Sequence, residues 1–223
     1  MPNLDLFIKR SMDKLIPSIT PASPTPSYHH GNLREALLAA SVDIIRNKGI
    51  QGLSLRNLAE VVGVSRTAPY HHFKDKDALL AAVAEHGFIE MKSFFADVIE
   101  NPEIPLVQKL KQSLTDYVQF ALKHPTQYEL MFGRDMWQAQ NHDEFQRIAK
   151  DCFRQYVRLF ELFKEKGLLA ESENPLRLAQ IMWASMHGLA KLACDGIFGK
   201  QEDLEDIIDY AMSRFEVLTH KPK

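Results

Sequence analysis

The sequence has little cysteine and no long apolar run. The only two cysteines among its 223 residues, Cys152 and Cys194, lie far apart and form no CxxC pair, a usage typical of a reducing compartment where both thiols stay free. No apolar run approaches the roughly 18–20 residues that a membrane-spanning helix needs. The first residues, with Asp5 inside a short apolar stretch, make a poor secretory signal. These absences predict a cytoplasmic protein that does not contact membranes.

Catalytic and cofactor-binding motifs are also missing. No HExxH, CxxC or Glu-x-x-His pattern occurs, which argues against zinc hydrolysis and di-iron bundles, and GxSxG, GxGxxG and P-loop patterns are absent. The pairs His29-His30 and His71-His72 do not suit one ion, because adjacent helical residues diverge by about 100°. We therefore expect no catalytic residue, metal or cofactor. A helical enzyme remains the alternative from another class, and oxidant sensing by a cysteine stays open.

Charge is unevenly distributed along a chain whose net charge is −2. Residues 28–76 carry seven Lys and Arg against four Asp and Glu, a net of +3, whereas residues 101–223 carry 16 basic and 18 acidic side chains, a net of −2. A locally basic segment on an otherwise acidic chain is typical of a small DNA-reading module attached to a body that avoids DNA.

Proline content and apolar spacing divide the chain into parts. Residues 1–27 contain five prolines, which favours an extended or disordered N-terminal extension. Beyond them apolar residues recur at the 3.6-residue spacing of helices, and no segment alternates with the period of two of a strand. The linker NPEIP at 101–105 separates a first helical unit from a second one at 101–223. These patterns predict an all-α fold.

The same spacing predicts the helix boundaries. The first helix ends at Lys48-Gly49, the second is short and has Ser54 as its N-cap, and Gly63-Val64 ends the second. A third short helix is expected at about 65–73 and a fourth from 75–77 to about 99. In the second unit we expect a loop after residue 132 and five helices, at 107–121, 126–132, 145–167, 176–198 and 204–218.

Residues 54–76 have the features of a helix-turn-helix. Ala59 offers a small side chain where two short helices cross, and Gly63, four residues on, permits the positive φ of a tight turn. Pro69 lacks an N–H, so we expect it in the first turn of the third helix, which then starts late or irregularly. Arg, Tyr, Thr and Ala side chains left on the outside suit a major groove. The helix N-terminus at Ser54 and the Lys76 ammonium each suit a phosphate.

The run from about residue 28 to 91, with Tyr70-His71-His72-Phe73 followed by Lys76, resembles the N-terminal domain of tetracycline repressor-like (TetR) regulators. The resemblance implies a three-helix DNA-binding domain, with its helix-turn-helix at 54–73, joined by a linking helix to a C-terminal helical ligand-binding and dimerisation domain. It implies a transcriptional regulator, more often a repressor than an activator, and not an enzyme. The implied DNA contacts are Ser54 and Lys76 to phosphate, and the following residues to bases or the groove: Arg56, Ser65, Arg66, Thr67, Ala68, Tyr70 and His71.

The helix predicted at 176–198 is apolar on two faces. The first face comprises Ala179, Met182, Trp183, Met186, Ala190 and Ala193, and the second comprises Leu178, Ile181, Ser185, Leu189 and Leu192. A helix that is apolar on both sides is buried on both. Because a DNA reader with one short recognition helix gains affinity from two-fold symmetry, we expect a homodimer through helices 176–198 and 204–218, bound to a palindromic operator.

The element Trp183-x-x-x-His187-Gly188 resembles the C-terminal domain of one branch of the TetR family. In this family the body binds a small molecule, which moves the helix after the recognition helix and releases the operator. On this resemblance, a small apolar effector is expected, although plain core packing is the more common role for any single candidate lining residue. The candidates are Tyr117, Tyr128, Met131, Phe132, Trp137, Phe153, Trp183 and His187. A constitutive DNA-binding protein without such a switch stays open.

Overall fold

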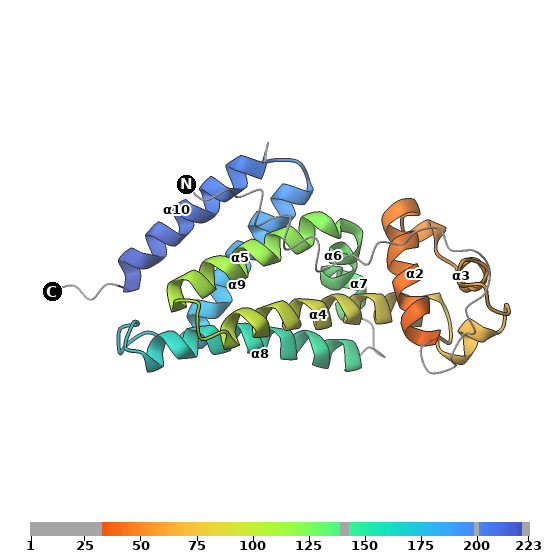
Figure 1. The fold of residues 1–223 in the computed structure, drawn as a ribbon, viewed down its shortest axis with the longest axis horizontal. Helices are drawn as coiled ribbons and strands as arrows, with labels where there is room; N and C mark the ends of the chain where they lie inside the picture. The colour runs from red at the N-terminus through yellow and green to blue at the C-terminus, as the bar shows by residue number, and fades with distance from the viewer. Residues whose placement is uncertain (1–32, 139–142, 199–200, 220–223) are drawn as a thin grey trace. The chain divides into compact units, whose positions relative to one another are not determined.

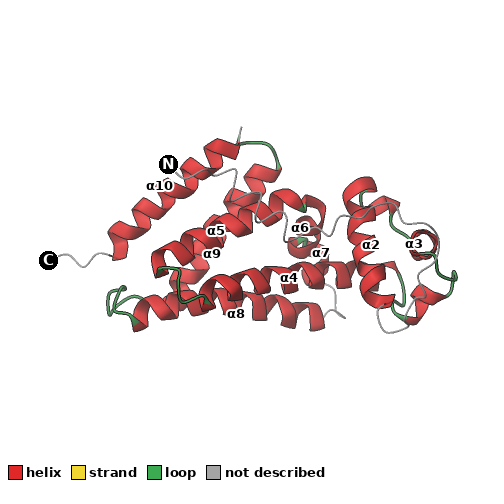
Figure 2. Cartoon of the chain, in the orientation of Figure 1, coloured by secondary structure: helices red, strands yellow, loops and turns green. Residues whose placement is uncertain are grey.

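The computed structural model describes residues 33–138, 143–198 and 201–219. Every regular element in these ranges is a helix (Figures 1 and 2), which confirms the all-α prediction. From Arg34 onward the chain packs as one unit. The N-terminal extension predicted at residues 1–27 lies outside the described residues.

Local capping groups set the limits of the first elements. These are α2 (Leu33–Lys48), the 3-10 turn η1 (Ile50–Gly52), α3 (Leu55–Val62), the 3-10 turn η2 (Ala68–His71) and α4 (Lys76–Glu100). Ser54 caps α3 by accepting the Asn57 N–H at 3.1 Å, as predicted. Gly63 ends α3 at a φ of 74°, in the left-handed region that glycine enters without strain.

The third helix predicted at 65–73 is wrong in length and type. The structure has only the turn η2 here, with hydrogen bonds from the Tyr70 N–H to the Thr67 carbonyl and from the His72 N–H to the Pro69 carbonyl. Pro69 lies in the first turn of η2 and has no N–H, so it cannot donate the hydrogen bond that an α-helix would need at this residue. The irregular start expected from Pro69 is therefore confirmed.

The remaining helices differ from prediction at two places. They are α5 (Leu106–Lys123), α6 (Pro125–Phe132), α7 (Arg134–Gln138), α8 (Asp143–Glu165), α9 (Pro175–Cys194) and α10 (Gln201–Thr219). The loop expected after residue 132 contains α7. Helix α9 ends at Cys194 rather than near Phe198, because Gly196 adopts a φ of 71° and the Ile197 N–H bonds back to the Leu192 carbonyl at 3.0 Å.

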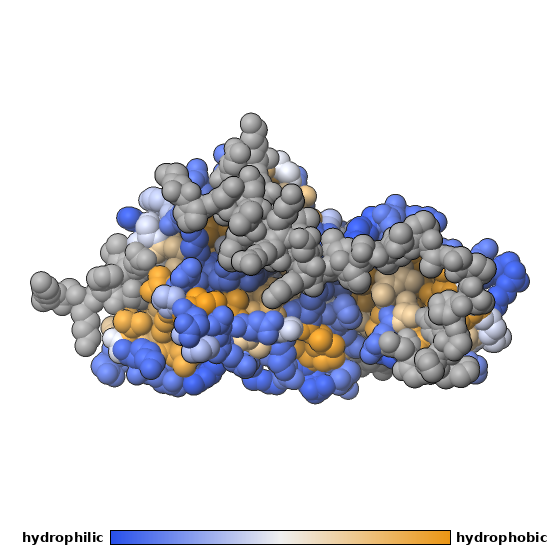
Figure 3. Space-filling model, viewed as in Figure 1, coloured by the Kyte–Doolittle hydropathy of each residue, from blue (hydrophilic) through white to orange (hydrophobic). Residues whose placement is uncertain are grey.

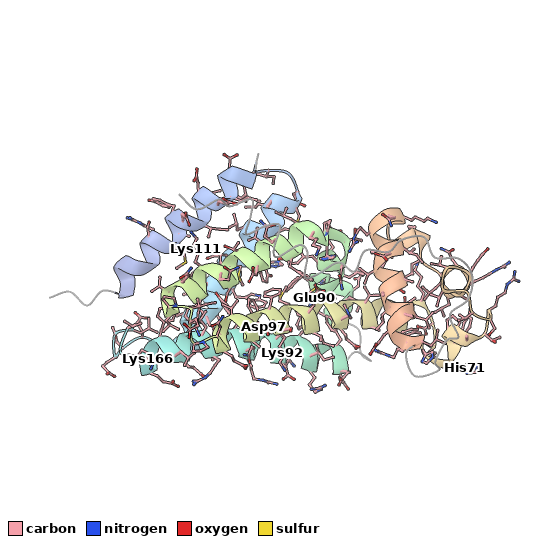
Figure 4. All side chains as sticks on the ribbon, in the orientation of Figure 1. His71, Glu90, Lys92, Asp97, Lys111 and Lys166 are labelled. Carbon is pink, nitrogen blue, oxygen red and sulfur yellow. The ribbon has the colours of Figure 1, made fainter. Side chains whose placement is uncertain are left out.

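Packing centres on α4, which lies along α8 and crosses α6, while α9 packs on α5 and α8 (Figure 1). Buried Gly87 permits the approach of α4 to α6, since a Cβ there would stand 2.4 Å from the Met131 sulfur. The Gln127 amide of α6 also donates to the Val83 carbonyl of α4 at 3.0 Å. Lys111 of α5, labelled in Figure 4, forms an ion pair with Asp209 of α10. None of the described helices is both long and apolar enough to cross a bilayer.

Candidate DNA-binding and effector sites

The predicted DNA-contacting side chains lie at the surface around α3 and η2. Exposed side chains are those of Ser54, Arg56, Ser65, Arg66, Thr67, Tyr70 and His71, the last of which is labelled in Figure 4. Tyr70 is 56% exposed, an unusual state for a large ring in the absence of a partner. Ala68 and Lys76 are half-buried. One short stretch of chain therefore presents two cationic side chains, a ring and several hydroxyls.

A small core holds this surface in place. Leu58 and Ala59 have no exposed surface and Phe73 is 3% exposed, which agrees with the crossing predicted at Ala59. Val62 and Val64 are only half-buried. The Arg34 guanidinium lies 5.6 Å from the centre of the Phe73 ring, so a cation–π contact joins α2 to the end of η2.

The two predicted phosphate contacts also have structural roles, the predicted N-cap at Ser54 and a contact of Lys76 that the sequence did not reveal. The Ser54 Oγ accepts the Asn57 N–H and still has its own proton to donate. The Lys76 Nζ donates to the Ile50 carbonyl at 2.8 Å, joining the start of α4 to η1. An ammonium has three protons, so Lys76 can hold this carbonyl and a phosphate together.

Three of the predicted effector contacts form a hydrogen-bonded triangle inside the C-terminal helices. The Tyr117 hydroxyl lies 2.9 Å from the Tyr128 hydroxyl and 3.2 Å from His187 Nδ1, and the Tyr128 hydroxyl lies 2.6 Å from the same nitrogen. We call these residues the hydroxyl triangle. It brings together α5, α6 and α9.

Aromatic rings surround the hydroxyl triangle. Trp183 makes edge contacts with Tyr117 and Phe153 at centroid distances of 5.3 and 5.4 Å, and the Phe132 ring lies 4.5 Å from His187. Two further rings that were not predicted as effector contacts, Phe95 and Tyr156, also contact Trp183. We define the aromatic cluster as Phe95, Tyr117, Tyr128, Phe132, Phe153, Tyr156, Trp183 and His187.

The other two candidates, Met131 and Trp137, pack beside this cluster. The Trp137 indole N–H donates to the Met131 carbonyl at 2.9 Å, and its ring contacts Phe88 and Phe145. Met131 is fully buried against Gly87. Two cavities, of about 270 and 980 Å3, are lined by other residues of α2, α4 and α6–α8. Seven of the eight candidates are buried or half-buried among one another and their neighbours, whereas Trp137 is 36% exposed.

Burial keeps the polar groups of the cluster neutral. It raises the pKa of the Tyr117, Tyr128 and Tyr156 hydroxyls above the ordinary range, with neighbouring hydroxyls adding to the effect at Tyr117. Burial also lowers the pKa of His187, and the nearby Lys191 ammonium acts in the same direction. The site therefore offers uncharged donors and acceptors within aromatic walls.

Helices α9 and α10 expose large apolar side chains. Ile181 is 63% exposed, Leu192 38% and Tyr210 66%, whereas Ala179 and Ala190 on the opposite face of α9 are fully buried. The two-faced character predicted for α9 is therefore observed in the single chain, with one face covered and the other open. Apolar surface is also visible between hydrophilic residues on the face drawn in Figure 3.

Metal and thiol chemistry find little support. Within the described ranges, no group of three or more His, Cys, Asp or Glu side chains is arranged to hold a metal ion. Cys152 is fully buried, and burial raises the pKa of its thiol. The Cys194 thiol is half-buried and its pKa is also raised by burial. Both thiols are thus poor nucleophiles at neutral pH.

Comparisons with known proteins agree with this architecture. Residues 37–83 match the family model described as bacterial regulatory proteins, tetR family, and residues 110–215 match the tetracyclin repressor-like C-terminal domain. A solved protein of unknown function from Rhodococcus sp. RHA1 is 30% identical with a TM-score of 0.77; the match covers 88% of this chain and 100% of that chain. The comparison with curated proteins finds no match.

A second solved structure carries the family name. This TetR-family transcriptional regulator from Pectobacterium atrosepticum is 25% identical with a TM-score of 0.63, and the match covers 86% of this chain and 96% of that chain. Both halves of the sequence and the arrangement of the helices lead to one assignment. The chain belongs to the TetR family and is a DNA-binding transcriptional regulator rather than an enzyme.

Proposed function

We propose that this regulator is a repressor that binds a palindromic operator as a homodimer and leaves it when a small effector binds the C-terminal helices. The exposed surface of α3 and η2 carries the DNA-binding part of the proposal, because it combines cations, hydroxyls and one exposed ring on a rigid support. We assign residues 28–91 to the DNA-binding domain and 101–223 to the regulatory and dimerisation domain. A protein that acts on operator DNA works in the cytoplasm.

Roles at the DNA follow from side-chain chemistry. Arg66 and Arg56 suit guanine edges, and Tyr70, Thr67 and Ala68 suit thymine methyls and the adjacent backbone. Ser54 and Lys76 suit phosphates beside the groove. Ser65 and His71 lie next to these groups and are proposed as further contacts. The positive charge of this segment supplies the salt-dependent share of affinity.

Selection of bound sequences from a random DNA pool tests this proposal and yields the operator. Arg66→Ala should lower affinity for the selected site by about 1–3 kcal/mol and relax specificity at one base pair. Lys76→Met should weaken binding to selected and unrelated duplexes alike. It should also reduce the slope of log affinity against log salt concentration by about one. A chain with no preference for any duplex at moderate salt contradicts the proposal.

The homodimer is supported by the open face of α9 and α10. The large apolar side chains of Ile181 and Leu192 on α9 and of Tyr210 on α10 are exposed in the single chain, and exposed apolar surface of this kind marks a contact site when it is gathered in one patch. A second copy of the chain covers them by a two-fold axis that also pairs the DNA readers. Sedimentation should therefore show a dimer that Ile181→Asp converts to monomer, while Val61→Asp, exposed at 56% on α3, should leave the dimer intact.

Effector release is supported by the contacts of the short helix α6. On one side Tyr128 belongs to the hydroxyl triangle. On the other side Gln127 bonds to the Val83 carbonyl of α4, and His124, which precedes α6, lies 3.1 Å from the Arg46 guanidinium of α2. A ligand that displaces the Tyr128 hydroxyl thus acts on a helix of eight residues that also holds α2 and α4. This geometry favours a switched regulator over a constitutive DNA-binding protein.

We also propose that the C-terminal domain belongs to the branch marked by Trp183, His187 and Gly188. Trp183 contacts four rings of the cluster, and His187 belongs to the hydroxyl triangle. These adjoining roles support the proposal that the two residues form one element. Release of the selected operator by metabolite extracts separates the switched regulator from the unswitched alternative. Operator binding that no extract changes supports the alternative.

A further inference from the structure

We infer that the effector is an uncharged, planar aromatic compound that carries a hydroxyl group and binds among the rings and hydroxyls of the aromatic cluster. This inference rests on the proposed function, which places an effector in the C-terminal helices. It adds the chemical class of that effector, which follows from the protons, lone pairs and charges of the cluster.

We infer the protons of the hydroxyl triangle for the His187 tautomer that carries its proton on Nε2. The neutral Nδ1 then has one lone pair and accepts from one hydroxyl only. The Tyr128 hydroxyl is nearer, at 2.6 Å against 3.2 Å for Tyr117, and takes that lone pair. Tyr117 then donates to the Tyr128 oxygen across 2.9 Å. Both hydroxyl protons are used inside the triangle in this arrangement.

The triangle consequently presents one acceptor and one donor to a ligand. The acceptor is the Tyr117 oxygen, whose lone pairs are not used by this arrangement. The donor is the His187 Nε2–H, for which the described residues supply no hydrogen-bond acceptor. A ligand hydroxyl can donate to the first and accept from the second, whereas a carbonyl or carboxylate can only accept.

A further buried hydroxyl points to the same chemistry. The Ser113 Oγ is fully buried without a hydrogen-bond partner among the described residues, one helical turn before Tyr117 on α5. Buried hydroxyls without partners are rare and destabilising, so a polar group of a ligand gains from meeting them.

The rings around these hydroxyls favour a flat ligand. Trp183 contacts Phe95, Tyr117, Phe153 and Tyr156 at centroid distances of 5.3–5.9 Å. Trp183 and Phe153 are half-buried while Tyr117, Tyr128 and Tyr156 are fully buried. A ligand from solvent therefore meets the Trp183 indole and the Phe153 ring first. It reaches the buried hydroxyls when these two rings shift. Aromatic walls stack with an aromatic plane.

The aromatic cluster contains no charged side chain that could serve as a counter-ion for a charged ligand. The three tyrosine hydroxyls are neutral at pH 7 at their ordinary pKa, which burial raises further, and burial lowers the pKa of the His187 imidazole and so favours its neutral form. The Lys191 ammonium, one turn along α9 from His187, is held by Asp195 at 2.8 Å and Glu129 at 3.5 Å. An ion that enters such a site loses its hydration without gaining a partner, so charge is selected against.

Calorimetric titration of the full-length chain with four naphthalene derivatives tests this class. The probes are 2-naphthol, naphthalene, 2-naphthoate and 2-naphthylmethylammonium, which share one ring system and differ in the polar group. We expect 2-naphthol to bind most tightly, naphthalene about 3- to 10-fold more weakly, and both ions at least about 100-fold more weakly.

Tyr117→Phe should reduce the affinity for 2-naphthol by about 3- to 10-fold and leave that for naphthalene unchanged, since it removes the acceptor and keeps the ring. Tyr128→Phe serves as the second variant, and Tyr70→Phe, on the DNA-binding surface, is the matched control that should change neither affinity. Equal binding of an ion, no binding of 2-naphthol, or indifference to both variants overturns the inference.

Operator release is measured separately in a mobility-shift assay. If 2-naphthol binds with the expected pattern and the operator stays bound, the effector-release function fails and the ligand class of the cluster stands. If a charged compound releases the operator equally well from the parent chain and from Tyr117→Phe, the function stands and the inference fails.

Discussion

Replacement of Gly87 by alanine tests how closely α4 and α6 are packed. An added Cβ would stand 2.4 Å from the Met131 Sδ, 3.2 Å from its Cγ and 3.1 Å from the Gln127 Nε2. Favourable contacts between such atoms lie near 3.5–4.0 Å. Met131 is fully buried, so its sulfur cannot escape toward solvent. Either the Met131 side chain must adopt another conformation within the filled core, or one of the two helices must shift.

Two opposing effects set the size of the change. Alanine in a helix interior is favoured over glycine by about 1 kcal/mol. Overpacking a filled core costs about 1–3 kcal/mol, and the short contact to Met131 places this case toward the upper limit. We expect a net loss of about 1–2 kcal/mol, which for a chain of this size lowers the unfolding temperature by roughly 2–8 °C.

Thermal unfolding followed by circular dichroism measures this loss, at one fixed protein concentration because the proposed dimer would unfold at a concentration-dependent temperature. Ser93→Ala, an exposed change on the same helix, is the control and should not lower the unfolding temperature. In a Met131→Ala background the contact is gone, so Gly87→Ala should become stabilising. A Gly87→Ala variant that unfolds at or above the parent temperature would refute the reasoning.

Four smaller predictions concern capping, charge, the dimer and the thiols. Ser54→Ala removes the N-cap of α3 and should cost about 1 kcal/mol in urea unfolding. Burial, together with the neighbouring Arg46 guanidinium, lowers the pKa of His124 to about 4, below its ordinary 6.5. Between these pH values the unfolded chain binds a proton that the folded chain does not, so stability falls as pH falls through this window, and His124→Gln should flatten the fall. An added Cβ at Gly188 meets nothing within 4 Å, so Gly188→Ala should leave the single chain unharmed and, on the proposed dimer face, weaken only the dimer in sedimentation. The Cys152 thiol should react with Ellman's reagent only on unfolding, as its burial and raised pKa require.

Features set by a few neighbouring residues were predicted well. Ser54 as an N-cap, Gly63 as a left-handed turn and the ends of α2 and α4 each depend on groups within one helical turn. The sequence also identified the two faces of α9, since helical periodicity alone separates Ala179 and Ala190 from Ile181 and Leu192. Such features need no knowledge of distant segments.

Elements whose form depends on competition between signals were predicted poorly. The apolar spacing at 65–73 suggests a helix, yet Pro69 withholds a donor and leaves only a 3-10 turn. Helix α7 has five residues, too few for a 3.6-residue period to be visible, and its Trp137 is anchored by a bond to the Met131 carbonyl. Two glycines, Gly196 and Gly199, follow α9 in the sequence, and either could end the helix. The helix ends before the first of them, Gly196.

The hydroxyl triangle marks the limit of sequence-based prediction for the site. Periodicity places Tyr117 on the inner face of α5, but Tyr128 lies 11 residues away and His187 lies 70, so no local spacing relates the three. Sliding α9 by one turn, about 5.4 Å, would leave every apolar stripe facing inward and carry His187 out of reach of both hydroxyls. Hydrogen bonds tolerate only a few tenths of an ångström. The proposed selection of ligands by this cluster therefore depends on the register between α5, α6 and α9. The packing of bulky rings such as Trp183 fixes this register, and the order of residues alone does not express it.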